Sequence, residues 1–128
     1  MIKSVTIPIR PVPAPRPRVT KFGAYNDPKY TKYKKTIQFY LKMLGYTENP
    51  VAVVLMFKYK IPKSWTKKKK LSPPQHTAKP DIDNLVKSVM DAMNGIAYKD
   101  DGQVVSVYGV KMYSDKDEVV IKITEIKE

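Results

Sequence analysis

The residues from Val51 to Tyr59 limit the fold more than any other stretch of this chain. The first seven, Val-Ala-Val-Val-Leu-Met-Phe, are all apolar, and Pro62 follows the run. An apolar run without polar alternation is typical of a strand inside a sheet, covered on both faces. Because proline lacks the N–H group that strand pairing uses, Pro62 marks the end of this strand. The sequence therefore predicts a sheet with this segment at its centre.

Two helices and three further strands are predicted around this central strand. Asp27-Pro28 is a helix-start signal, since a capping residue precedes a proline at the first helical position, and Gly45 ends that helix. A second amphipathic helix runs from about Asp83 to Asn94. Alternating apolar residues predict strands at 3–10 and from 119 onward, and residues 104–113 are predicted to form a further strand.

The order of these elements predicts an α+β fold, with a small mixed sheet of about four strands and two main helices packed on one side. At 128 residues the chain is expected to form a single domain, 1–128. Prolines recur at positions 11, 13, 15 and 17 between the first strand and the first helix. This spacing favours an extended arm.

The charge of the chain indicates a polyanionic partner. The formal net charge is +12 and the pI is near 9.8, which favours nucleic acid first and an anionic membrane surface second. The alternative is that the lysines only keep the protein soluble. The absence of cysteine excludes disulfides and cysteine-based zinc sites. No signal-peptide core or membrane-length apolar run is visible, and we expect a cytoplasmic protein without membrane contact.

Basic side chains gather in the arm and in a loop after the central strand. In both places a solvated, non-binding segment is the competing interpretation. The loop holds four consecutive lysines beside the only tryptophan, Trp65, and its single histidine is the kind of residue that is usually incidental. The candidate DNA-binding residues are Arg16, Arg18, Lys67, Lys68, Lys69, Lys70, His76 and Lys79.

Carboxylates are scarce, yet five aspartates fall between positions 81 and 101. Like charges this close repel one another, and a divalent cation removes that cost. Asp81 and Asp83 have the spacing that places both side chains on one side of an extended segment. Topology allows Asp101 to join them without requiring it. Lys87, one turn into the helix, would reach the same phosphate and stabilise transition-state charge. The cluster therefore predicts magnesium-dependent phosphodiester chemistry.

Two other interpretations of the acidic cluster were weighed. An EF-hand loop that starts at Asp81 would need glycine and glutamate where Val86 and Ala92 stand, so that motif is excluded. A capping and turn cluster before the helix remains open, because Asp83 or Asn84 can cap the helix.

The sequence resembles the RusA family of Holliday junction resolvases. The resemblance rests on Lys79-Pro80-Asp81-Ile82-Asp83-Asn84-Leu85-Val86-Lys87, then Met90-Asp91-Ala92-Met93-Asn94-Gly95, then Asp100-Asp101-Gly102-Gln103-Val104. It implies a small α+β homodimer that binds four-way DNA junctions and cuts two strands symmetrically with Mg²⁺, for which Mn²⁺ is an expected substitute. It also implies a bacterial protein of phage or prophage origin.

The resemblance assigns roles to individual residues of this chain. Asp81, Asp83 and Asp101 match the family's metal-binding positions, and Lys87 matches its catalytic lysine. Asp100 matches the first acid of the second pair and stays a further candidate metal ligand. Two rivals remain: a non-catalytic nucleic-acid-binding module, and a related nuclease that acts on forks, flaps or packaging intermediates.

Overall fold

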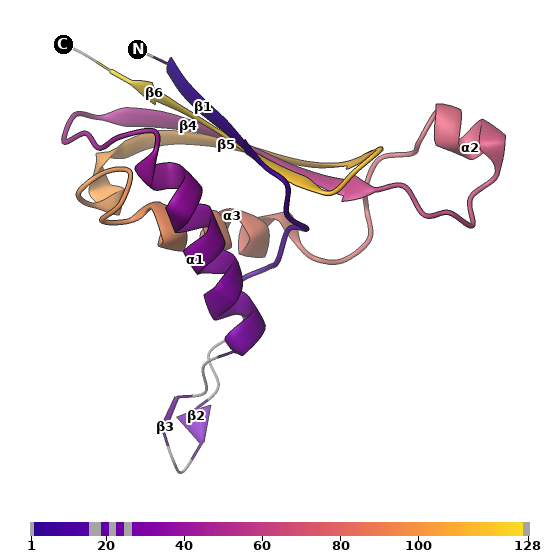
Figure 1. Ribbon diagram of the computed structural model, residues 1–128, viewed down its shortest axis with the longest axis horizontal. Coiled ribbons are helices and arrows are strands. Elements are labelled where there is room, and N and C mark those ends of the chain that lie inside the picture. The colour runs from indigo at the N-terminus through magenta and orange to yellow at the C-terminus, as the bar shows by residue number, and fades with distance from the viewer. Residues whose placement is uncertain (1, 16–18, 21–22, 25–26, 127–128) are drawn as a thin grey trace.

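The computed structural model describes residues 2–15, 19–20, 23–24 and 27–126. Its main sheet has four strands in the order β1-β6-β4-β5 (Figure 1). The strands are β1 (Ile2–Ile7), β4 (Val51–Lys60), β5 (Val104–Ser114) and β6 (Glu118–Glu125). Strand β4 pairs parallel with β5 and antiparallel with β6, and β1 pairs antiparallel with β6. The predicted mixed sheet of about four strands is confirmed.

Strand β4 lies inside the sheet as expected, but only one of its faces is fully covered. Val51, Val53 and Leu55 alternate with half-buried residues along the strand. The prediction that both faces are covered is therefore wrong. The run is apolar throughout because its second face, which carries Val54 and Met56, is still half-buried. Apolar residues on a half-open face cannot be told from core residues by periodicity alone.

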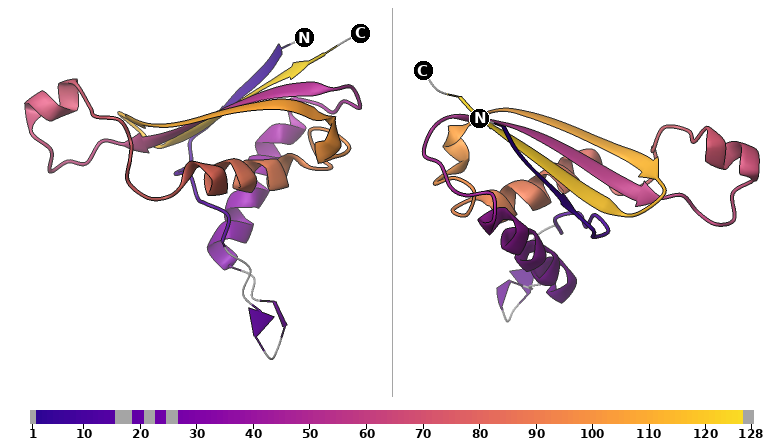
Figure 2. Two further views of the ribbon diagram at one scale, coloured as in Figure 1. Left: turned by 180° about the vertical axis from the view of Figure 1, so that it is seen from behind. Right: turned by 45° about the horizontal axis from the view of Figure 1, so that its top comes forward.

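Two helices cover the same face of the sheet (Figures 1 and 2). Helix α1 (Pro28–Lys42) starts as predicted, because the Asp27 carboxylate accepts from the Lys29 N–H at 2.9 Å. Helix α3 (Ile82–Met93) supplies the connection that the parallel pair of β4 and β5 needs. It packs so closely on β5 that a Cβ at Gly109 would lie 2.8 Å from the Val86 side chain. The core lies between these helices and the sheet.

Three short elements complete the described chain. A two-stranded ribbon, β2 (Val19–Thr20) and β3 (Gly23–Ala24), follows the proline repeat of the arm. Helix α2 (Lys67–Leu71) projects beyond the end of the sheet (Figure 1), and the 3-10 turn η1 (Asp101–Gln103) precedes β5. Within the described ranges no helix is long and apolar enough to cross a membrane.

A continuous stack of side chains fixes the base of the α2 loop to the sheet. The His76 ring lies between Tyr59 and Tyr113, with ring centroids 4.8 and 4.5 Å away. Trp65 meets Tyr113 edge-on at 4.7 Å. The ends of the stack are cationic, since Arg10 lies 4.9 Å from the Tyr59 centroid and Lys69 lies 4.1 Å from that of Trp65. The stack thus joins the arm, two strands and the basic loop.

Candidate functional site

The two aspartates at the start of α3 are exposed and do not cap the helix. Asp81 occupies the N-cap position, but its side chain accepts no first-turn hydrogen bond. Its carboxylate instead pairs with the Lys79 ammonium group at 2.8 Å. Asp83 lies within the first turn of the helix. The expectation that Asp83 or Asn84 caps α3 is therefore wrong, and the interpretation of these acids as helix caps loses its main support.

Lys87 lies one helical turn after Asp83, and the carboxylate of Asp91, one turn further on, holds its side chain. Its Nζ atom lies 3.2 Å from the Asp91 carboxylate, as the spacing of four residues predicts. The Tyr30 hydroxyl on α1 donates to the same carboxylate at 3.0 Å. Burial, and then the charge of Asp91, raise the pKa of Tyr30, so this phenol stays a neutral donor. Tyr30 and Asp91 therefore orient Lys87.

The second acidic pair divides into a structural and a candidate functional residue. Asp100 caps η1, because its carboxylate accepts from the Gly102 N–H at 2.9 Å. The Asp101 carboxylate accepts from the Tyr98 hydroxyl at 3.0 Å, and the Asp101 N–H donates to the Asn94 side chain. Burial, followed by the hydrogen bond to Asp101, raises the pKa of Tyr98. These contacts make Asp101 the better oriented of the two candidate ligands.

A single chain does not bring the three candidate ligands together. Asp81 and Asp83 lie where α3 begins, whereas Asp101 lies beside Asn94, the residue that ends the helix. A helix of 12 residues is about 18 Å long. Accordingly, the part of the chain that the structure describes contains no group of three or more acids or histidines able to hold a metal ion.

Lys111 on β5 fixes the segment that enters α3. Its Nζ atom donates to the carbonyl oxygens of Ala78 and Pro80, at 2.6 and 2.7 Å. Pro80 directly precedes Asp81, so these bonds fix the approach of the first aspartate. No sequence motif pointed to Lys111. The one sequence feature that could have identified Lys111 is a charged residue at a strand position that faces the helices.

The arm also contacts the first turn of α3. The Ala14 N–H donates to the Asn84 carbonyl oxygen at 2.9 Å, which places the arm against the first turn of α3. The Tyr59 hydroxyl donates to the Pro11 carbonyl oxygen at 3.2 Å. The arm is thus held at two points along its described part. Arg16 and Arg18, two of the predicted DNA contacts, lie outside the described residues.

The glutamine of the second motif has a structural role. The Gln103 amide donates to the carbonyl oxygens of Thr47 and Asn49, at 3.1 and 3.0 Å. The Thr47 hydroxyl and the Asn49 amide both donate to the Glu125 carboxylate. This network ties η1 to the loop before β4 and to the end of β6, and so it fixes the position of Asp101.

The basic loop presents its lysines to solvent on a fixed base. The four residues of the predicted lysine cluster, Lys67 to Lys70, are exposed on α2, and Thr66 caps that helix through the Lys69 N–H. Lys79 is exposed beside Asp81. His76 differs from the prediction, because only 8% of it is exposed within the aromatic stack. We therefore assign it to anchoring the loop instead of contacting DNA.

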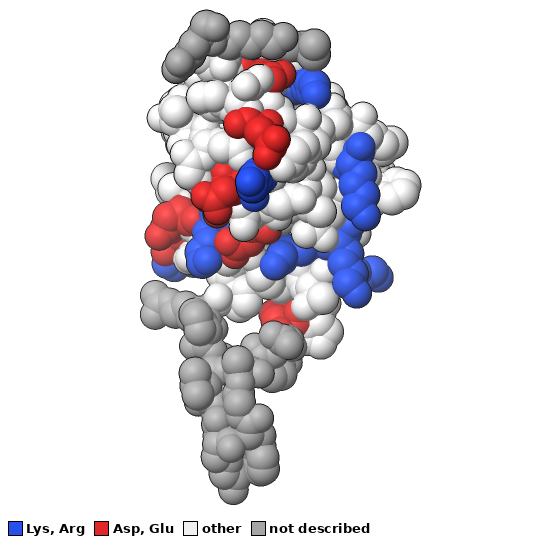
Figure 3. Space-filling model, turned by 90° about the vertical axis from the view of Figure 1, so that its left-hand side faces the viewer, with Lys and Arg blue, Asp and Glu red and all other residues white. Residues whose placement is uncertain are grey.

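Charge is not uniform over the surface. Figure 3 shows the end of the molecule where α3 ends and η1 lies, with acidic side chains gathered near the middle and basic side chains between them. A polyanion is repelled by exposed carboxylates unless cations lie between them. The acidic side chains on this face therefore lie beside basic ones that offset part of their charge.

Comparison with known proteins shows a match to one protein family over most of the chain. A family model described as Endodeoxyribonuclease RusA matches residues 8–124. The uncharacterized protein YqaN of Bacillus subtilis (strain 168) is 50% identical over 50 residues, which are 39% of this chain and 35% of that protein. Crossover junction endodeoxyribonuclease rusA of Lactococcus phage r1t is 39% identical over 51 residues, 39% of each chain. The matched segments span well under half of these two relatives.

Proposed function

This chain belongs to the RusA endodeoxyribonuclease family, and from that membership we propose that it cuts DNA at branch points. Its substrate is a four-way junction, which it resolves by paired symmetric nicks in recombination and repair. The observation that carries this proposal is the pair of exposed aspartates at the start of α3, whose carboxylates are not used to cap the helix. Residues 72–80 connect them along the chain to the four exposed lysines of α2. We place the protein in a bacterial cytoplasm, with a phage or prophage origin.

The donor set fits a magnesium ion. Mg²⁺ is commonly held by one or two carboxylates together with substrate phosphates. Asp81 and Asp83 supply two exposed carboxylates, and Asp101 supplies a third that Tyr98 orients. When bound, Mg²⁺ activates a water nucleophile and neutralises charge on the reacting phosphate, and Mn²⁺ is an expected substitute. Asp100 is not included, because its carboxylate is used by the cap of η1.

The protein's own groups position the DNA strand. Lys87, held by Asp91, places a cation one turn beyond Asp83, where charge builds up on the phosphate in the transition state. Lys111 fixes Asp81 through the main chain before it. The lysines of α2 hold the strand through phosphate contacts, which give affinity and orientation without base specificity.

The separation of the aspartates supports action as a homodimer. Asp81 and Asp83 lie at one end of α3 and Asp101 at the other. A two-fold pair of chains with antiparallel α3 helices would place the start of each helix beside the Asp101 of its partner. Such a pair would carry two equivalent sites, one for each strand that must be cut.

One gel assay tests the proposed function. Junction, fork, flap and linear duplex DNA would each be incubated with the protein, with and without Mg²⁺. We expect paired symmetric nicks that are confined to the junction and need the metal. Cutting restricted to forks or flaps would move the assignment to a related nuclease. Binding without cutting of any substrate would instead identify a non-catalytic DNA-binding module.

A further inference from the structure

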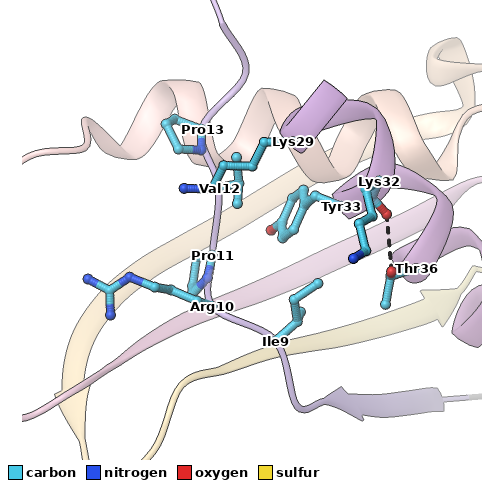
Figure 4. Close-up of a pocket in the computed structure, with 9 residues that line it drawn as sticks. All are labelled: Ile9, Arg10, Pro11, Val12, Pro13, Lys29, Lys32, Tyr33 and Thr36. Atoms are coloured by element: carbon cyan, nitrogen blue, oxygen red, sulfur yellow. Dashed lines mark hydrogen bonds between the residues drawn. The ribbon is translucent and has the colours of Figure 1, made fainter. Parts of the chain in front are cut away.

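A pocket of about 250 Å³ lies between the arm and helix α1, outside the acidic site (Figure 4). The arm side consists of consecutive residues 9–13, and the helix side consists of two lysines, Tyr33 and Thr36. Ile9, Val12 and the Tyr33 ring give it largely apolar walls. Its volume suits a single small planar group and is below that of most pockets for drug-sized ligands.

One polar atom at this pocket has no partner. The Tyr33 hydroxyl is buried, and no described residue forms a hydrogen bond of acceptable geometry with it, although Ser88 and the Val12 main chain lie nearby. Tyr33 as a whole is 2% exposed, and its ring points toward the arm in Figure 4. Buried polar groups in folded proteins are nearly always hydrogen-bonded. The Tyr33 hydroxyl has almost no accessible surface, so a ligand in this pocket would meet the Tyr33 ring and not its oxygen.

The rim of the pocket is cationic. Arg10, Lys29 and Lys32 line it, and none of the described lining residues is acidic. Arg10 is already paired with Asp117, whereas no ion pair within the described ranges involves Lys29 or Lys32. Apolar walls below two lysines suit a ligand with a flat, uncharged body and a negatively charged attachment. A nucleotide has this form, with its base as the body and its phosphate as the charge.

The pocket adjoins the start of α3. Pro13 lines it, and the next residue, Ala14, bonds to the Asn84 carbonyl oxygen in the first turn of that helix. Asn84 follows Asp83 directly. A strand that passes the candidate ligands would therefore lie within reach of the pocket through the adjacent residues of the arm.

We propose that this pocket receives one unpaired base of the branched DNA, with the adjoining phosphate held by Lys29 and Lys32. The inference rests on the proposed function, since it takes DNA as the ligand. Bases at a branch point are cheaper to unstack than those inside a duplex, and an aromatic wall rewards an extruded base without selecting its identity.

The test pairs removal of the base with filling of the pocket. Junctions would carry an abasic site at each nucleotide beside the branch point in turn, and affinity would be measured without divalent metal. With the unaltered protein we expect one position at which base removal weakens binding about tenfold. With Thr36→Phe, which fills the pocket, the same base removal should change affinity less than about twofold, because the base no longer has a site.

Thr31→Phe is the matched control. Thr31 and Thr36 both lie on α1, and each donates its hydroxyl to the carbonyl four residues earlier, at 3.1 and 3.0 Å. Thr31 does not line the pocket, so its variant should keep the full tenfold effect. Thr36→Leu fills part of the pocket and serves as a second variant if Thr36→Phe does not fold, with Thr31→Leu as its control. It should reduce the effect of base removal, whereas Thr31→Leu should keep the full effect.

Equal base dependence in both threonine variants, or no sensitive position with the unaltered protein, would overturn the inference. Neither result touches the proposed nuclease activity, which is measured on intact junctions with Mg²⁺. If the unaltered protein neither bound nor cut intact junctions, the proposed function itself would fail.

Discussion

The Lys111 ammonium group on β5 donates to the carbonyl oxygen of Pro80 at 2.7 Å, which links the sheet to the residue before Asp81. A second bond from the same Nζ atom reaches Ala78 at 2.6 Å. The aspartate at the start of α3 is thus positioned by a lysine about thirty residues later in the sequence. Under the proposed function, Lys111 is therefore a positioning residue that acts through the main chain before Asp81.

Lys111→Met should separate catalysis from binding. Small displacements of reacting groups can lower rates about 100-fold, so we expect a loss of that order in single-turnover nicking, a higher Mg²⁺ requirement and nearly unchanged junction affinity. Lys111→Arg should restore part of the rate, since guanidinium also donates to carbonyls. The control is Lys122→Met, which removes an exposed lysine from β6. Equal behaviour of the two methionine variants would refute the positioning role.

Asp83→Asn and Asp101→Asn should each reduce nicking to background while junction binding persists, because each removes a carboxylate and leaves the basic footprint. Mixing the two inactive proteins tests the dimer. If each site combines the α3 start of one chain with Asp101 of its partner, mixed pairs contain one intact site and should nick one strand. No recovery on mixing, with pair exchange verified independently, would place all ligands within one chain.

The lysines of α2 should contribute to affinity through phosphate contacts. For Lys68→Gln combined with Lys70→Gln, the plot of log binding constant against log salt should become shallower by about two units. Cutting position should not change, since phosphate contacts carry no base readout. Fluorescence anisotropy over a salt series measures the slope. Lys122→Gln provides a single-charge control from the sheet. If the double substitution in α2 left the slope unchanged, α2 would be excluded from the DNA interface.

Unfolding stability should fall as the solution is acidified below the ordinary pKa of histidine, about 6.5. Burial, then the charges of Lys111 and Arg10, lower the pKa of His76, which packs between Tyr59 and Tyr113. The unfolded chain therefore takes up a proton that the folded chain resists, and the free energy of unfolding decreases. His76→Phe keeps an aromatic ring in the stack and should flatten this pH dependence between about pH 7.5 and 5 in denaturant titrations.

Tyr33→Phe should stabilise the fold by about 1 kcal/mol, because it removes a buried hydroxyl that lacks a partner. Burial raises the pKa of this phenol to about 12, so the hydroxyl stays neutral through the physiological range. Denaturant unfolding of the free protein measures the change. Tyr46→Phe is the control, since Tyr46 is 51% exposed and its loss should have little effect. Destabilisation by Tyr33→Phe alone would mean that the hydroxyl has a partner in the folded protein.

Local signals in the sequence were sufficient for most of the fold. The start of α1 follows from Asp27 and Pro28, because capping depends only on adjacent residues. The four strands of the main sheet follow from alternation or from runs of apolar residues, which are equally local signals. The second face of β4 was not predictable, because an apolar side chain looks the same in sequence whether its neighbour is another element or solvent.

The acidic residues of the candidate site and Lys87 were predictable, but the residues that orient the acids were not. Asp81 and Asp83 stand out by spacing, yet Lys111 and Tyr98 orient acids through contacts that form only after β5 and the turn before it have folded back. The division between Asp100 and Asp101 likewise depends on the capping geometry of η1. Such contacts depend on three-dimensional proximity, which spacing along the chain does not encode.

The edge-on contact of Trp65 with Tyr113 also has a practical consequence for spectroscopy. Trp65 is the only tryptophan in the chain. Besides Tyr113, its ring contacts Lys69, whose Nζ atom lies 4.1 Å from the ring centroid. Its ultraviolet emission is therefore an intrinsic, label-free probe of one place, the base of the α2 loop. A spectral shift on addition of DNA would therefore report a change at the base of this loop.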